Sequence, residues 1–211
     1  RAPIQLEKSQ NPTTASNPSL TLSLPERPMV LLVTQPGFAQ QYLHLLRLLA
    51  TVSVESSPIN VVVKLHPRDS DTTVNVFSTH VKGTPRNAIH VVRDFDIRVL
   101  IQQAEIVVTI FSNVGIEAAM ENKKLVVANL EQRKLPLPLD TFGVGLNART
   151  ESELFDALNG LLISNDVIST LNERQRHFFM SNPHLTAGNS TERLWSLIQA
   201  NVVPQTVSQD R

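Results

Sequence analysis

The stretch Met29-Val30-Leu31-Leu32-Val33-Thr34-Gln35-Pro36-Gly37 decides the fold class of this chain. Its unbroken apolar run is typical of a strand that is buried on both faces, as strands of parallel sheets are. The turn residues Gln35-Pro36-Gly37 end the run, because proline has no N–H to donate to a neighbouring strand. The stretch therefore predicts a buried parallel strand, and the residues after it recur at the spacing of an amphipathic helix: Phe38, Tyr42, Leu45, Leu46 and Leu49.

The same alternation of strand and helix repeats along the chain. Further strands are predicted at Ile59 to Leu65, Ile89 to Val92, Glu105 to Ile110, Lys124 to Ala128 and Val144 to Ala148. Helices are predicted between them at Thr72 to Val81, Asp96 to about Gln103 and Asn113 to Glu121. This order predicts an α/β fold: a doubly wound, Rossmann-like parallel sheet of about six strands with helices on both faces. Ligands of such sheets bind at the carboxyl ends of the strands.

The predicted domain runs from residue 29 to residue 202. Residues 1–28 are rich in Pro, Ser, Thr and Asn and read as a linker or tail, and residues 203–211 read as a frayed terminus. Two late helices carry start signals, Thr150-Glu151-Ser152-Glu153 and Asn189-Ser190-Thr191-Glu192. Because the sequence starts at Arg1 with neither Met nor a signal peptide, we expect it to be a fragment of a longer protein.

The composition limits the possible partners. The 211 residues are 41% hydrophobic and 18% charged, which suits a soluble globular protein. Nineteen basic residues balance nineteen acidic ones, so no overall field attracts nucleic acid or an anionic membrane, and any anion site must be local. The absence of cysteine excludes disulfides and thiolate metal sites and fits a cytoplasmic protein. No apolar run has the length of a transmembrane segment.

His66 directly follows a predicted strand, at the mouth of the expected crevice. Pro67 ends the strand pairing and holds His66 in an extended backbone, so its imidazole has a fixed position. Lys64 lies two residues earlier on the same strand face and Arg68 follows, so the group offers several donors to a phosphate. A plain His-Pro turn with solvated charges is the alternative.

Ser112 stands where the helix after the fourth strand begins. Gly115 lies in the first turn of that helix, where a missing side chain allows another group to approach the backbone. Free N–H groups and the helix dipole make such a helix start a seat for an anion, and Glu117 is positioned to accept bonds from ribose hydroxyls. The alternative is that Ser112 is an ordinary cap and Gly115 a packing residue.

Asp94-Phe95-Asp96 is formally a metal-binding Asp-x-Asp pattern. Two carboxylates need further oxygen ligands, which the sequence does not supply, so we predict no metal site. Asp96 directly precedes an apolar helical run and is expected to cap it, whereas Asp94 closes a strand and stays a candidate nucleotide contact.

The motifs of several other site types are absent, which argues against those sites. Ser112 is not in a Gly-x-Ser-x-Gly elbow, which argues against a serine hydrolase. No Gly-x-Gly-x-x-Gly follows the first strand, which argues against dinucleotide binding. His177 and His184 have no partner at metal-ligand spacing, and His44 and Arg47 lie on the polar side of a predicted helix.

Taken together, these motifs resemble the carboxyl-terminal, nucleotide-binding half of GT-B glycosyltransferases. The closest likeness is to the capsule-polysaccharide and CDP-glycerol glycerophosphotransferase-like groups, with sialyltransferases and UDP-GlcNAc 2-epimerases more distant. The matching order is a Lys-x-His-Pro at a strand end, an Asp-x-Asp-Ile before a helix, and a strand that runs into Ser-x-x-Gly-x-Glu-Ala. In this chain these are Lys64 to Pro67, Asp94 to Ile97 and Ser112 to Ala118.

The resemblance implies roles for these residues. His66 and Ser112 would contact the phosphates of a CDP-, CMP- or UDP-linked donor and stabilise the leaving nucleotide, which makes His66 the catalytic candidate. Lys64 or Arg68 would assist, Glu117 would meet the ribose, and Asn113 stands where many relatives have a second serine. No other cofactor is firmly implied.

The resemblance also implies a partner. The acceptor site and general base of GT-B enzymes usually belong to an amino-terminal half, so the fragment alone is expected to bind a donor without turning it over. The complete enzyme is expected to be cytoplasmic, with a peripheral membrane association as a further expectation. Two alternatives stay open: half of a UDP-sugar 2-epimerase-like enzyme, or a non-catalytic Rossmann-like interaction module. The second predicts that His66 and Ser112 lie apart or that side chains fill the crevice.

Overall fold

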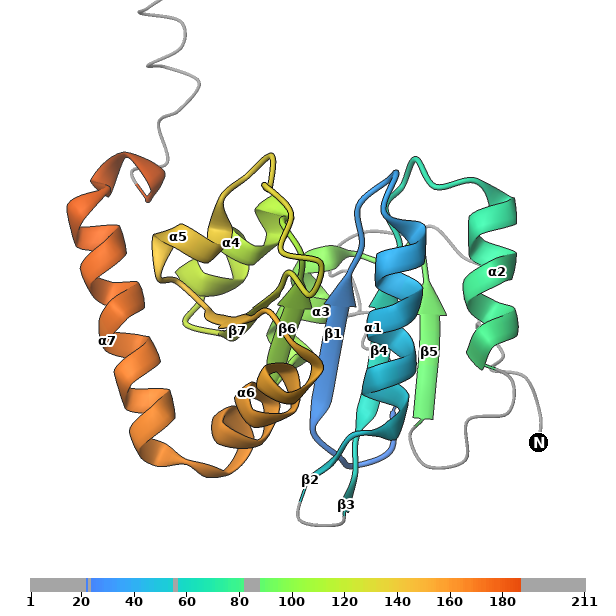
Figure 1. Cartoon of the computed structure of the whole chain (residues 1–211), viewed down its shortest axis with the longest axis horizontal. Helices are drawn as coiled ribbons and strands as arrows, with labels where there is room; N and C mark the ends of the chain where they lie inside the picture. Colours follow the sequence, from blue (N-terminus) through green and yellow to red (C-terminus); the bar gives the residue numbers. More distant parts are fainter. Residues whose placement is uncertain (1–21, 23, 55–56, 82–87, 187–211) are drawn as a thin grey trace, which may run out of the picture.

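The computed structural model describes residues 22, 24–54, 57–81 and 88–186, and a six-stranded parallel sheet forms its centre (Figure 1). The strand order is β5-β4-β1-β6-β7-β8. The predicted Rossmann-like sheet is therefore confirmed, with every strand at its expected place: β1 (Met29–Val33), β4 (Asn60–Lys64), β5 (Ala88–Val92), β6 (Ile106–Thr109), β7 (Lys124–Ala128) and β8 (Leu146–Ala148). A small antiparallel pair, β2 (Ser53–Val54) and β3 (Ser57–Pro58), precedes β4.

The order of the strands reverses beside β1. The chain passes from β1 to β4 and β5 on one side, and then returns to place β6, β7 and β8 on the other side. This is the strand order of doubly wound nucleotide-binding sheets, in which ligands bind where the direction reverses. A ligand site is therefore expected at the carboxyl ends of β1, β4 and β6.

Helices connect the strands and cover both faces of the sheet. In Figure 1, α1 and α6 lie in front of the strands and α3 lies behind them. The predicted helices that fall within the described residues are present there. The helices of these residues are α1 (Ala39–Thr51), α2 (Asp71–Val81), α3 (Ile97–Gln103), α4 (Asn113–Met120), α5 (Leu139–Phe142), α6 (Glu151–Ile163), α7 (Asn165–Ser181) and a 3₁₀ turn η1 (Pro183–Leu185).

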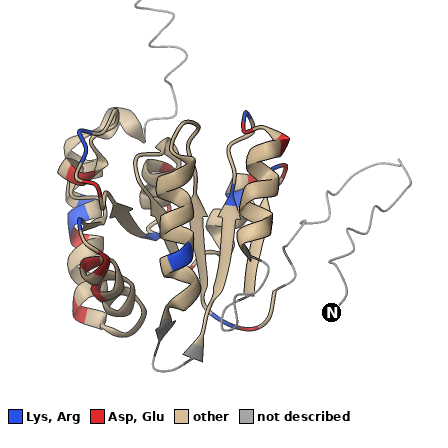
Figure 2. Ribbon diagram, turned by 45° about the vertical axis from the view of Figure 1, so that its right-hand side comes forward, with Lys and Arg blue, Asp and Glu red and all other residues tan. Residues whose placement is uncertain are grey.

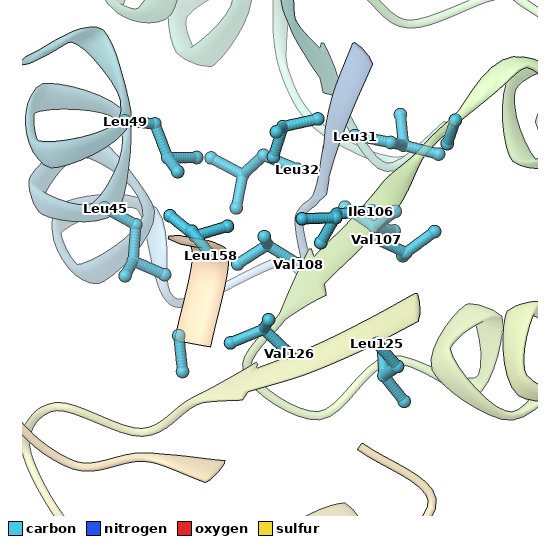
Figure 3. Packing of buried hydrophobic residues seen from close by; sticks show 14 of the residues in the cluster. Leu31, Leu32, Leu45, Leu49, Ile106, Val107, Val108, Leu125, Val126 and Leu158 are labelled. Atoms are coloured by element: carbon cyan, nitrogen blue, oxygen red, sulfur yellow. The ribbon is translucent and has the colours of Figure 1, made fainter. Parts of the chain in front are cut away.

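The core consists of two apolar layers, one on each face of the sheet. In Figure 3, Leu32 and Val108 face Leu45 of α1 and Leu158 of α6, while Leu31 points to the opposite side. All five of these side chains are buried. Because both faces of the sheet are covered, its central strands carry continuous apolar runs.

Side-chain caps start the helices where the sequence predicts them. Thr150 Oγ1 accepts the N–H of Glu153 at 3.1 Å, and Asp96 Oδ1 accepts the N–H of Arg98 at 2.8 Å. Asp96 is thus a helix cap, as expected. The second predicted start signal, at Asn189, lies outside the described residues, as do the predicted terminus 203–211 and most of the predicted tail.

The described part of the segment before β1 lies against the domain. Asn60 Nδ2 donates to Pro25 O at 2.7 Å, and the N–H of Leu22 donates to Gln103 Oε1 at 3.2 Å. Leu22 and Leu24 also pack against the core. These contacts attach the segment to β4 and α3.

Charged residues of both signs lie mainly on helices and connecting loops, whereas the strands are mostly uncharged (Figure 2). Within the described ranges, none of the helices combines the length and apolar character needed to cross a bilayer.

Candidate functional site

Strand register brings the predicted site residues to one edge of the sheet. Val33 at the end of β1 lies beside Lys64 of β4 on one side and Thr109 of β6 on the other. The residues that follow these three strands therefore emerge together. They border a cavity of about 340 Å³, lined by Val33, Thr34, Gln35, Lys64, Leu65, His66, Pro67, Phe95, Ile97, Ser112, Asn113 and Val114.

His66 is half-buried at this cavity, and its ring is held in one tautomer. The N–H of Arg68 donates to His66 Nδ1 at 3.1 Å. Since Nδ1 accepts this bond, the proton of the neutral imidazole must be on Nε2. The Nε2 side of His66 is therefore a hydrogen-bond donor.

Asp69 fixes the turn that carries His66, a role that sequence reasoning missed. Its N–H donates to His66 O at 2.9 Å, and its Oδ2 accepts the N–H of His66 at 2.9 Å. Thr34 Oγ1 lies 3.4 Å from the same carboxylate oxygen and ties the turn to the end of β1. The order Pro67-Arg68-Asp69 is itself a turn signal that could have pointed to this role.

Ser112 is fully buried at the start of α4, and two donors reach its hydroxyl oxygen. The N–H of Val114 donates to Ser112 Oγ at 3.2 Å, and Gln35 Nε2 donates to it at 2.9 Å. A hydroxyl accepts at most two hydrogen bonds and donates one. Ser112 can therefore only donate to a further partner.

Buried groups beneath Ser112 join the ends of β1 and β6. Thr109 Oγ1 donates to Val33 O at 3.1 Å and accepts the N–H of Ser112 at 3.3 Å. Tyr42 Oη lies 3.5 Å from Thr109 Oγ1 and accepts the N–H of Ile110 at 3.4 Å. Burial raises the pKa of Tyr42 to about 12, so its phenol stays protonated. Sequence reasoning assigned Tyr42 only to the helix core.

Lys64 borders the cavity, but its ammonium is bound by the protein. Nζ donates to Leu65 O at 3.1 Å and to Arg93 O. Its side chain is almost completely buried, and this burial lowers the pKa of the ammonium, although nearby Asp94 and Asp69 oppose the effect.

The lowered pKa of Lys64 predicts a pH-dependent stability. The folded chain holds this proton less tightly than the unfolded chain does, so stability rises with pH between the lowered pKa and the ordinary value of about 10.4. Relative to Lys64→Met, the wild-type chain is expected to gain free energy of unfolding across this window. Urea unfolding of both proteins at several alkaline pH values measures the difference. Parallel curves would contradict the prediction.

The other predicted nucleotide-binding residues differ in whether they line the cavity. Asn113 lines the cavity, whereas Arg68, Asp94 and Glu117 are exposed and do not line it. Asp94 pairs with Arg93, whose Nε lies 3.4 Å from Asp94 Oδ2. Contacts of these residues with a ligand stay predictions.

Gly115 is explained by packing. A Cβ atom added to it would lie 3.0 Å from Leu139 Cδ1 and 3.3 Å from Thr109 Cγ2. The close approach that glycine allows is therefore made by core side chains, which was the alternative considered for this residue. A ligand contact of its backbone stays a prediction.

Within the described ranges, no three His, Asp or Glu side chains come together as metal ligands would. Asp94 and Asp96 are engaged by Arg93 and by the N–H of Arg98, respectively.

Comparison with known proteins gives one family match. Residues 32–129 match the family model described as capsule polysaccharide biosynthesis protein, a range that includes His66 and Ser112. A search of curated proteins finds no significant match.

Solved structures share the fold at low sequence identity. The wall teichoic acid polymerase TagF, solved with CDPG, has a TM-score of 0.59 and 13% identity, and the match covers 85% of this chain and 42% of that one. A glycosyltransferase from Rickettsia africae has a TM-score of 0.53 and 14% identity, with 75% and 44% covered. HepE of Anabaena, solved with UDP and glucose, has a TM-score of 0.52 and 14% identity, with 81% and 48% covered.

The predicted resemblance is confirmed. The chain resembles capsule polysaccharide biosynthesis proteins over just under half of its length, and its fold matches a part of each of the three solved chains. The matched part spans less than half of each of the three solved chains.

Proposed function

We propose that this chain binds the nucleotide part of an activated donor in a glycosyltransferase or sugar-phosphate transferase of surface glycan synthesis. One observation carries the proposal: His66 and Ser112 line the same cavity, and each presents a hydrogen-bond donor. His66 Nε2 carries the ring proton, and Ser112 Oγ already accepts two hydrogen bonds and can only donate a further one. Two fixed donors on opposite sides of β1 suit an anion, and the phosphates of a nucleotide donor are such an anion.

The helix start strengthens the anion site. Ser112 caps α4, so the positive end of the helix dipole lies at the same cavity. In a transfer reaction, charge develops on the phosphate of the leaving nucleotide. Donors that are already oriented stabilise this charge without further reorganisation, which gives His66 its proposed role in catalysis.

The rest of the cavity suits a base or sugar ring. Phe95, Ile97, Pro67 and Val114 contribute apolar surface next to the donors. Apolar walls with a few oriented polar groups are typical of small-molecule sites. CDP, UDP and CMP are the candidate nucleotides, and the names of two similar structures include CDPG and UDP.

A second half of the protein would supply the acceptor site. The chain covers 42% of the teichoic acid polymerase and 48% of HepE, which supports a missing partner domain. On this proposal the chain alone binds a donor but does not transfer it. The interaction-module hypothesis is less well supported, because it requires His66 and Ser112 to lie apart or the crevice to be filled.

Calorimetric titration with CDP, UDP and CMP tests the proposal. We expect at least one of them to bind, and His66→Ala to weaken that binding by tenfold to a hundredfold, because a hydrogen bond to a charged group contributes about 1.5–3 kcal/mol. His177→Ala is the matched control, since His177 is exposed on α7 and does not line the cavity.

Two outcomes contradict the proposal. One is that none of the three nucleotides binds at millimolar concentration. The other is that His66→Ala binds the preferred nucleotide as well as His177→Ala does.

A further inference from the structure

Gln35 lies two residues after the end of β1, where the strand order reverses. Its side chain is half-buried, borders the cavity and reaches the start of α4, where Nε2 donates to Ser112 Oγ at 2.9 Å. The two residues are 77 positions apart in the sequence. The contact therefore joins the loop after β1 to the loop after β6 across the site.

The backbone around Gln35 restricts where this side chain can be. Pro36 follows directly, which biases Gln35 toward an extended backbone. Gly37 then adopts a φ of 84°, which only glycine enters readily, and the chain turns into α1. Gln35 is thus held at the cavity by the turn.

The consequence for Ser112 follows from the count of its hydrogen bonds. Val114 occupies one acceptor position of the hydroxyl, which is the ordinary bond of a helix cap. With this bond alone, the hydroxyl could turn its second lone pair toward the cavity and repel an anion. The bond from Gln35 fills that second position. Only the proton of Ser112 is then left to face a ligand.

We propose that Gln35 is a positioning residue that sets the polarity of the Ser112 hydroxyl and so makes this serine a donor to an anion. The proposal rests on the proposed function of the site and extends it to a residue outside the predicted motifs. It also restricts the ligand, because a group that bonds to Ser112 must be an acceptor at that atom. A phosphate oxygen meets this requirement, whereas an ammonium group does not.

Two substitutions of Gln35 test the proposal, with inorganic pyrophosphate and CDP as ligands in calorimetry. Gln35→Met keeps the length of the side chain and removes the donor, so we expect binding to weaken by about threefold to tenfold. Gln35→Glu replaces the donor with a carboxylate that accepts the Ser112 proton and repels the anion, so we expect a loss of at least a further tenfold. Gln40→Glu is the control, because it makes the same charge change at an exposed position of α1.

A double-mutant cycle distinguishes this role from a general structural one. If Gln35 acts through Ser112, Gln35→Met has no further effect on binding in the Ser112→Ala background. Thermal unfolding of each variant shows whether it is folded at the titration temperature, and Gln35→Met and Gln35→Glu provide two independent variants for the comparison.

The outcomes separate the inference from the function. Suppose that the wild-type chain binds CDP or pyrophosphate, and that Gln35→Met weakens this binding equally in the wild-type and Ser112→Ala backgrounds. Gln35 then does not act through Ser112, although the proposed function stands. The same holds if Gln35→Glu binds like Gln40→Glu. If the wild-type chain binds neither pyrophosphate nor any of the nucleotides, the proposed function fails and the inference fails with it.

Discussion

Thr109→Val is expected to lower the free energy of unfolding by about 3 kcal/mol and to weaken nucleotide binding by about tenfold. Thr109 is fully buried, and its hydroxyl serves three groups: Val33 O, the N–H of Ser112 and Tyr42 Oη. Valine has nearly the same shape but leaves these groups without that partner, and each unpaired buried group costs roughly 1–3 kcal/mol. Urea unfolding and calorimetry with the preferred nucleotide measure the two effects.

Thr109→Ser is the matched control for this prediction. It keeps the hydroxyl and removes only a methyl group, so binding is expected to stay within about threefold of the wild-type affinity. If the valine and serine variants bind the nucleotide equally well, the hydroxyl does not position Ser112.

Leu158→Ala is expected to cost about 2–5 kcal/mol of unfolding free energy, which is the usual range for a buried leucine. Leu158 is completely buried, and Figure 3 shows it among the side chains of β1, β6 and α1. The loss is expected because the rigid sheet cannot close the cavity that the shorter side chain leaves.

Leu162→Ala, one turn later on α6, is the control for Leu158→Ala. Leu162 is only half-buried, so the same substitution should cost clearly less. Urea midpoints with comparable slopes measure both variants. Equal losses at the two positions would mean that α6 does not pack on the sheet as described.

The sequence predicted the sheet well because burial on both faces leaves a strong local pattern. Each strand is an apolar run of a few residues followed by a turn, and the alternation of strands with helices predicts that the strands are parallel. The helix α7 was missed for the opposite reason. Among its 17 residues only Leu171 and Gln175 are buried, and most of the others are polar, so the segment lacks a recognisable apolar face. Ser164, whose Oγ accepts the N–H of Val167, was its one clear start signal.

The candidate site was predicted in part. His66 and Ser112 follow strands directly, so a local pattern was enough to place them at the same edge of the sheet. Asp69 had only a turn signal in its local sequence, and nothing local marks the roles of Gln35 and Thr109. Their roles come from contacts that form only after folding, such as the bond from Gln35 to a serine 77 positions away.

Gly115 illustrates the limit of a motif. A glycine at a helix start fits both a ligand that approaches the backbone and a neighbouring core side chain. The sequence cannot separate the two cases, because each requires only that the Cβ atom be absent. The distances to Leu139 and Thr109 identify a core contact that is sufficient to explain the glycine.

The bond from Arg68 to His66 has a consequence for how this loop can evolve. The donor is the main-chain N–H of Arg68, so every amino acid except proline supplies it. Natural variation can therefore exchange the guanidinium for any other side chain without altering the proton position on the imidazole. Substitutions at position 68 therefore test only the guanidinium. They leave in place the main-chain N–H that bonds to His66 Nδ1.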